Sequence, residues 1–424
     1  MTPEAAHAAV RFGLGGKPDA PVPDDPRPWL LAQLRPMPVL DGPDLEEIRK
    51  ARFEDDREAA LRLRRTLVEG ETTAWAARML TTDAAFAERW AEFWGNHFAI
   101  SRRSINLNLL AGHFQRVAVR PLVFGSFEAL MLSVYRHPAM LGYLDQAGSI
   151  GPGSRAGQRR SRGLNENLAR ECLELHSVTP AAGYTQADVT ALARILTGWS
   201  IGRGAEHNEP AGFIFRAAGH EPGPKTLMGR EFPEGEAGGV AALTMLANHP
   251  ATHRALAQKL AAHFVQDDPP PAAAARIEAA LRNSGGDLAA AARAVIAEPE
   301  AWRPLAKLRS AQDYAIAVMR GLGLGAPAAP QLVQVLGRLG QPLWRPPAPT
   351  GWPDDAASWA VPEQLMRRVE WANELAARAA FTPALTESFL GPLARAETVT
   401  AARRAGSARE AVLLLLASPE AQRR

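Results

Sequence analysis

Cysteine is nearly missing from this chain of 424 residues, which contains only Cys172. An intrachain disulfide is therefore excluded, and so is any metal or redox motif that needs a pair of cysteines. Runs of about 18 apolar residues are also missing, which argues against a transmembrane segment. The first residues, MTPEAAHAAVRFGLGG, lack the basic and apolar regions of a secretory signal. We therefore expect a cytoplasmic protein.

Lysine is also rare: only five of the 48 lysines and arginines are lysines, although the formal net charge is just +3. Acidic residues are interleaved with the arginines, so no clustered basic surface suggests a nucleic-acid partner, and we expect none. Where nearly every cation is an arginine, a lysine marks a position that favours a compact ammonium over a planar guanidinium. The candidates for such positions are Lys17, Lys50, Lys225, Lys259 and Lys307.

Alternating strand patterns are scarce, and helical periodicity dominates the chain. A hydrophobic fraction of 46% is enough for sizeable cores at this length. We predict a mostly α protein, a multi-helix globular body with one small embedded β-hairpin over 211–232. Its two strands are expected in the segments GFIFRAAGH and KTLMGREFP.

Two parts are predicted along the chain. Residues 1–43 comprise an N-terminal helix and a Pro-rich extended segment, and residues 44–424 form a single helical domain. Gly, Ser and Arg fill most of 148–163, which predicts a mobile loop. The remaining parts of the domain are helices over 44–147, motif helices over 164–200, the hairpin region 202–238, and helices over 239–424 with a Trp/Pro loop at 341–360.

The segment GLNENLARECLELHS, residues 163–177, is unusually polar for one short helix. At about 100° per residue, its polar groups share one side of the helix, next to an apolar side. That polar side holds Glu166, Asn167, Arg170, Glu171 and Glu174, while Asn165 suits the N-cap. Charges spaced four residues apart also suit a solvated ion-pair ladder, so a structural face and a functional site both remain open.

The next helix is delimited by local signals. Thr185 and Asp188 have the spacing of a capping box, and Gly198 is a natural residue to follow the last turn. Beyond it, GHEPGPKT resembles a phosphate-binding loop but is one residue short, and Pro224 removes a backbone N–H that such a loop needs. His220 and Lys225 are left as polar groups on a tight turn, facing either a cleft or water.

Aromatic motifs supply further candidates. In FWGNHF, the pair Trp90 and Trp94 one turn apart indicates core packing, and His97 follows on the same helix. TGWS contains Trp199. In GWPDDAASW, Trp352 and two aspartates stand in a rigid loop of the kind found at sugar and small-molecule sites, although packing of the loop onto the body is the alternative.

No cofactor motif is evident, but a divalent metal has to be considered. Glu174 and His176 are about 160° apart on a regular helix, so they cannot share one ion unless the helix breaks there. A hard cation held by Glu171, Glu174 and Asn167, with His97 or His220 from elsewhere, remains an alternative.

Six segments together resemble the bacterial domain of unknown function 1800 family, and the resemblance covers almost the whole chain. They are GLNENLARECLELHS, GYTQADVTALARILTGW, FWGNHF, HPAMLGYLD, FIFRAAGHEPGPKTLMG and GWPDDAASW. Members typically read Asn-Glu-Asn, Ala-Arg-Glu and Glu-Leu-His, which correspond here to 165–167, 169–171 and 174–176. Their hairpin usually has His-Asp, where this chain has Glu221. Many relatives look exported and are encoded beside a phosphatase-superfamily-like protein, which implies a protein partner, and no activity is established for the family.

Two hypotheses of different class follow. In the first, the protein is an enzyme that uses acid–base catalysis on a polar or anionic small molecule or glycan. Its catalytic candidates are Glu171, Glu174, His176, His97 and His220, and its substrate-binding candidates are Asn165, Asn167, Arg170, Lys225, Trp199 and Trp352. In the second, the same residues form a structural network, and the protein binds a glycan or protein partner without catalysis. The first hypothesis predicts that Asn167, Glu171, Glu174, His97, His220 and Lys225 converge on one polar pocket.

Overall fold

The computed structural model describes residues 1–159 and 163–424, and it confirms a mostly α protein with twenty-one α-helices in those ranges. The first ten helices are α1 (Pro3–Arg11), α2 (Pro26–Leu31), α3 (Leu45–Phe53), α4 (Arg57–Thr81), α5 (Ala85–His97), α6 (Ile105–His113), α7 (Phe127–Arg136), α8 (Pro138–Tyr143), α9 (Asn167–Glu171) and α10 (Gln186–Leu196). The others are α11 (Glu236–Ala247), α12 (Pro250–Phe264), α13 (Pro271–Asn283), α14 (Leu288–Ala297), α15 (Ala311–Gly321), α16 (Ala329–Arg338), α17 (Ala356–Trp359), α18 (Pro362–Ala376), α19 (Pro383–Phe389), α20 (Ala396–Arg403) and α21 (Ala408–Leu416).

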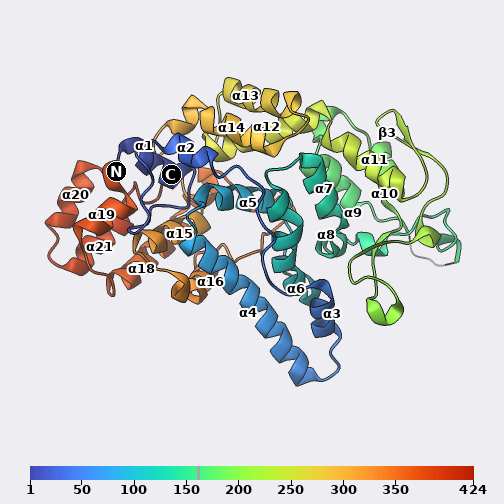
Figure 1. The fold of residues 1–424 in the computed structure, drawn as a ribbon, viewed down its shortest axis with the longest axis horizontal. Coiled ribbons are helices and arrows are strands. Elements are labelled where there is room, and N and C mark those ends of the chain that lie inside the picture. The colour runs from blue at the N-terminus through green and yellow to red at the C-terminus, as the bar shows by residue number, and fades with distance from the viewer. Residues whose placement is uncertain (160–162) are drawn as a thin grey trace.

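Two large hydrophobic cores organise these helices. The larger core joins side chains from α5 to α14, and the smaller one joins α4 with α15, α16, α18, α19 and α21. Figure 1 shows α5 in the middle of the molecule, between the C-terminal helices on one side and α7 to α11 on the other. The far half of α4 projects from the body. No helix in the described part of the chain is long and apolar enough to cross a membrane.

Helix α5 is central because one of its faces is wholly apolar. Phe86, Trp90 and Trp94 are fully buried in the larger core, as expected for Trp90 and Trp94. The Trp90 indole N–H donates to the carbonyl of Val123 at 2.7 Å, which satisfies the polar atom of the indole inside the core. The opposite face of α5 is therefore available for polar side chains.

The strand pairing differs from the single hairpin predicted over 211–232. The structure has two separate antiparallel pairs: β1 (Trp199–Ile201) with β2 (Phe213–Phe215), and β3 (Lys225–Leu227) with β4 (Arg230–Phe232). Met228 and Gly229 both have positive φ, at 48° and 76°, which is the backbone of a two-residue hairpin turn. The segment KTLMGREFP thus folds on itself, and the other predicted strand pairs with residues that follow α10.

The second motif helix, α10, begins as predicted. Thr185 and Asp188 form the capping box of α10, and Gly198 follows its end with φ at 88°. The polar motif is not one regular helix, because α9 passes into a wider π-helical turn over Cys172–His176. Such turns insert an extra residue and are frequent at functional sites. The turn rotates His176 inward, where it is buried.

Two irregular regions also have defined structure. The Pro-rich segment expected to be extended contains α2, whose first turn is capped by the Asp25 side chain. The predicted mobile loop 148–163 includes residues 160–162, which lie outside the described residues. Its described part is hydrogen-bonded to the segment before β3, with the Gly151 N–H donating to the carbonyl of Gly219 at 2.9 Å. Mobility of this loop stays a prediction.

Candidate functional site

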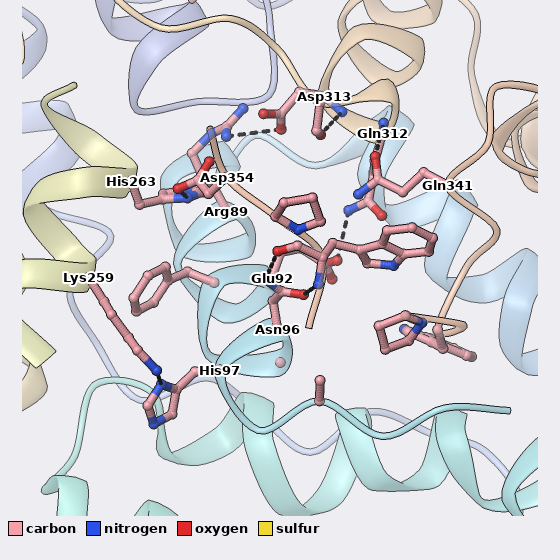
Figure 2. A pocket seen from close by; sticks show the side chains of 18 of the residues that line it. Arg89, Glu92, Asn96, His97, Lys259, His263, Gln312, Asp313, Gln341 and Asp354 are labelled. Atoms are coloured by element: carbon pink, nitrogen blue, oxygen red, sulfur yellow. Dashed lines mark hydrogen bonds and ion pairs between the residues drawn. The ribbon is translucent and has the colours of Figure 1, made fainter. Parts of the chain in front are cut away.

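A cavity of about 330 Å³ lies against the polar face of α5 (Figure 2). Its other walls come from α12, from the start of α15 and from the Trp/Pro loop, here residues 341–354. On α5, Arg89, Glu92 and Asn96 are spaced by three and four residues, which places them on one side of the helix, away from the buried tryptophans. Segments more than 200 residues apart in the sequence therefore meet around one space.

Asn96 ties the Trp/Pro loop to α5. Its side-chain amide donates to the carbonyl of Trp352 at 2.9 Å and accepts from the Trp352 N–H at 2.7 Å. Gly351 has φ at 82°, and a Cβ there would lie 2.5 Å from the Asn96 carbonyl oxygen, so this close approach requires glycine. Ser101 also donates to the carbonyl of Pro346 at 3.0 Å. The segments FWGNHF and GWPDD therefore contact each other and form one continuous part of the cavity wall.

Most charges near the cavity are paired. Arg89 lies 3.0 Å from Asp313, and Arg424 lies 3.1 Å from Asp313 and 3.3 Å from Asp354. Burial alone would raise the pKa of Asp313, but Arg89 and Arg424 outweigh it and hold the pKa at about 2. These ion pairs neutralise one another, so they contribute little net charge to the cavity.

His263 is oriented by a carboxylate. Its Nδ1 lies 2.6 Å from Oδ2 of Asp354 (Figure 2). Burial lowers the pKa of His263 to about 4 in spite of that carboxylate, so the imidazole is neutral near pH 7. Nδ1–H then donates to Asp354, and Nε2 carries a lone pair. That Nε2 is covered and has no hydrogen-bond partner among the described residues.

Glu92 has only neutral partners. The Trp75 indole N–H donates to Oε1 at 2.7 Å, and the Gln312 side-chain amide donates to Oε2 at 3.0 Å. No lysine, arginine or histidine of residues 1–159 or 163–424 forms an ion pair with this carboxyl. Burial raises the pKa of Glu92, which favours the protonated acid.

Lys259 is a cation in the cavity wall that, like Glu92, has no ion-pair partner among the described residues. Its ammonium donates to the carbonyl of Leu175 at 2.7 Å and lies 3.4 Å from Nδ1 of His97 (Figure 2). Within the described part of the chain, no Asp or Glu lies close enough to pair with it. Burial lowers the pKa of Lys259 to about 8, so part of the amine is neutral near pH 7.

The structure brings together His97 and His176. The His97 Nε2 lies 3.3 Å from the His176 carbonyl, and the two rings are 5.7 Å apart. The Tyr135 hydroxyl lies 2.9 Å from Nδ1 of His176. Burial lowers the pKa of His97 well below its ordinary value and that of His176 to about 3. Both are neutral rings next to Lys259, and only His97 lines the cavity.

The carboxylates of the motif helix lie elsewhere. Glu174 and Asn167 are exposed, and Glu171 is half-buried, with burial and then the nearby Glu174 raising its pKa. Arg170 forms the expected ion pair with Glu166 at 3.0 Å. The Asn165 side chain accepts from the Asn167 N–H at 2.8 Å, but Asn165 is not the expected N-cap, because Glu166 occupies that position in α9. Trp199 is fully buried in the larger core, whereas Trp352 lines the cavity.

His220 and Lys225 form a self-contained group at the hairpin. The Lys225 ammonium lies 3.1 Å from Nε2 of His220, which also accepts from the Gly235 N–H at 2.9 Å. Nδ1 of His220 donates to the carbonyl of Thr197 at 2.7 Å. Each polar atom thus has a partner, and neither residue lines the cavity.

The α5 cavity does not gather the six residues that were predicted to converge on one pocket. Of Asn167, Glu171, Glu174, His97, His220 and Lys225, only His97 lines the cavity. The helical wheel correctly grouped the polar side chains, but the apolar side with Leu168 and Cys172 packs into the core and turns the carboxylates outward. Residues 1–159 and 163–424 contain no cluster of three or more His, Cys, Asp or Glu able to hold a metal ion.

Three residues of this cavity were not predicted from the sequence: Glu92, His263 and Asp354. Glu92 is hidden in a helix dominated by aromatic core residues, and His263 has no motif around it. Two signals did point this way: the scarcity of lysine marked Lys259, and the loop motif GWPDD contains Asp354.

Comparison with known proteins identifies a family and nothing closer. A family model described as "Protein of unknown function (DUF1800)" matches residues 7–423. No curated protein and no solved structure matches the chain. The motifs of the cavity wall and of the α9 region both fall within the matched range. Because the match covers nearly the whole sequence, the chain belongs to the DUF1800 family of proteins of unknown function.

Proposed function

We propose that the protein is an enzyme that binds a small polar molecule in the α5 cavity and transfers protons there. The observation that carries this proposal is the presence of Glu92 and Lys259 on one cavity, each without an ion-pair partner in the described ranges. Neighbouring charges such as Arg89 and Asp313 are all paired. A fold that pairs its buried charges but leaves one acid and one amine facing a cavity provides the groups that acid–base catalysis needs.

The two groups suit opposite directions of transfer. Burial raises the pKa of Glu92 and so favours its protonated carboxyl, which can donate a proton to a developing negative charge. The lowered pKa of Lys259, at about 8, leaves a neutral amine fraction that can accept one. His263, held by Asp354, presents a neutral imidazole in the same wall. Residues of the Trp/Pro loop form another part of that wall.

One observation favours a second function. Trp344 and Trp352 both line the cavity, and indole faces beside polar groups are typical of sugar-binding sites. The protein would then bind a glycan without catalysis, and its charged network would serve only to hold the loop. This alternative differs from the first because it requires no proton transfer by Glu92.

The proposal is tested by incubating the protein in D2O with four pools of small molecules and recording ¹H NMR spectra. The pools are sugars with sugar acids, hydroxy acids with keto acids, amino acids, and nucleosides. We expect product signals or deuterium exchange at carbon in at least one pool, and loss of that change in Glu92→Gln. Glu231→Gln, a substitution at an exposed carboxylate on β4, should behave as wild type. No change in any pool, or full activity of Glu92→Gln, would refute acid–base catalysis in this cavity.

A further inference from the structure

We infer that the ligand of the α5 cavity is a hydroxylated monocarboxylate of the sugar-acid class, whose carboxylate binds Lys259. This inference rests on the proposed function only in placing the ligand in that cavity. It is carried by three observations: the unbalanced charge, the excess of hydrogen-bond donors, and the aromatic part of the wall.

The cavity wall has one positive charge that no carboxylate of the described residues neutralises, so it can bind one anionic group. The guanidinium of Arg89 is neutralised by Asp313, and Asp354 is shared by Arg424 and Lys307. Lys259 is then the one ammonium or guanidinium lining the cavity, within the described residues, that has no carboxylate. One uncompensated ammonium in a buried wall matches a single negative charge. A phosphate dianion would bring a second charge with no cation to meet it.

The polar groups that are still free are mainly donors. The Lys259 ammonium uses two of its three N–H groups on Leu175 and His97, which leaves one. The Gln341 Oε1 accepts from the Gln312 N–H at 2.7 Å, but its amide nitrogen makes no hydrogen bond to residues 1–159 or 163–424. The Trp344 indole N–H is buried and also lacks a partner in those ranges.

Gln115 adds a side-chain amide to the same wall, and this amide makes no hydrogen bond to residues 1–159 or 163–424. It reaches the cavity across Gly95, where a Cβ would lie 2.4 Å from its Oε1. Apart from the lone pair on Nε2 of His263, the free groups of this wall are an ammonium, an indole N–H and two amides, and such a wall favours a ligand rich in oxygen acceptors. A carboxylate with several hydroxyl groups has that chemistry.

Part of the remaining wall is aromatic. Phe93, Trp344 and Trp352 line the cavity, and aromatic faces of this kind cover the C–H side of a sugar ring. A volume of about 330 Å³ is at the small end of ligand sites, which suits a molecule of monosaccharide size.

The test uses isothermal titration calorimetry with D-galacturonate as the probe and neutral D-galactose and glucose 6-phosphate as comparisons. We expect the wild type to bind galacturonate at least tenfold more tightly than either comparison. Lys259→Met should lose at least tenfold in affinity for galacturonate, and Lys50→Met, at an exposed lysine, should not change it. Trp344→Phe, which keeps the ring but removes the N–H, should weaken binding severalfold and serves as the reporter if Lys259→Met does not fold.

Three results would overturn the inference. They are equal affinity for galactose and galacturonate, preference for the phosphate, and galacturonate binding that is unaffected by both Lys259→Met and Trp344→Phe. None of these touches the proposed function, which fails separately if Glu92→Gln retains the conversion seen by NMR. Conversely, tight Lys259-dependent binding of galacturonate without any conversion would support the sugar-acid ligand and refute the enzyme.

Discussion

The lysines are the individual residues whose positions the composition explains best, because nearly every other cation in the chain is an arginine. Lysine is rare, and Lys225, Lys259 and Lys307 each occupy a partly or fully buried position with specific acceptors. The Lys307 ammonium, for example, donates to Asp267 and to the carbonyl of Ala262, each at 2.7 Å. The bias toward arginine made these positions visible in the sequence. The partners of Lys259 and Lys307 were not visible, because they lie far along the chain, whereas His220 lies only five residues from Lys225.

At Lys259, the lowered pKa predicts unusual amine chemistry. Competitive labelling with a trace of acetic anhydride over pH 6–11, read by mass spectrometry, measures the titration of each lysine. We expect Lys259 to titrate with a midpoint near its pKa of about 8, clearly below that of exposed Lys50. The sign follows from burial, which disfavours the charged ammonium. Equal midpoints for the two lysines would show that Lys259 is well solvated and would remove the proposed proton acceptor.

At the scale of elements, local signals were read correctly and long-range contacts were not. The capping box of Thr185 and Asp188 depends on residues three apart, so the sequence reveals it. The bonds between Asn96 and Trp352 join residues 256 apart, and no periodicity encodes them. The strand segment Phe213–Phe215 was recognised, but its partner was not, because a short strand carries no signal for which neighbour it pairs with.

The Trp/Pro loop should depend on Asn96. Asn96→Ala removes two hydrogen bonds to the Trp352 backbone and leaves its N–H and carbonyl without those partners. We expect a loss of about 1–3 kcal/mol in the free energy of unfolding, with faster amide exchange over 346–354 by hydrogen–deuterium exchange mass spectrometry. Asn283→Ala, at an exposed residue that ends α13, is the matched control. Unchanged exchange in the loop would mean that other contacts hold it.

For the whole molecule, composition and periodicity predicted the mostly α fold, and the structure adds two cores that meet near α5. The position of the cavity could not be predicted, since it depends on how these helices pack.

Most histidines of the molecule share one property: burial lowers the pKa of eight of the ten. These are His7, His97, His113, His137, His176, His220, His253 and His263.

These eight histidines predict that the folded protein becomes less stable as the pH falls. Between the ordinary pKa of 6.5 and folded values of about 4 or lower, the unfolded chain binds protons that the folded chain excludes. Stability is therefore present above pH 6.5 and falls as the pH drops toward 4, by roughly 1–2 kcal/mol at pH 5 for each fully buried histidine. We expect the melting temperature to drop by roughly 10 °C or more between pH 7.5 and 5. The variant of exposed His207, His207→Gln, should follow the same profile, and a flat profile would contradict this burial.

The central claim is that the α5 cavity, and not the outer face of α9, is the functional site. The most direct measurement is the rate of the conversion found by ¹H NMR, compared between Glu92→Gln and Glu171→Gln, with melting temperatures recorded for both. Each substitution keeps the shape of the side chain and removes its ionisable carboxyl group. We predict that Glu92→Gln lowers the rate at least 100-fold with its melting temperature preserved, while Glu171→Gln stays within a few-fold of wild type. The reverse order, with Glu171→Gln inactive and Glu92→Gln active, would contradict the account and assign the site to the α9 motif.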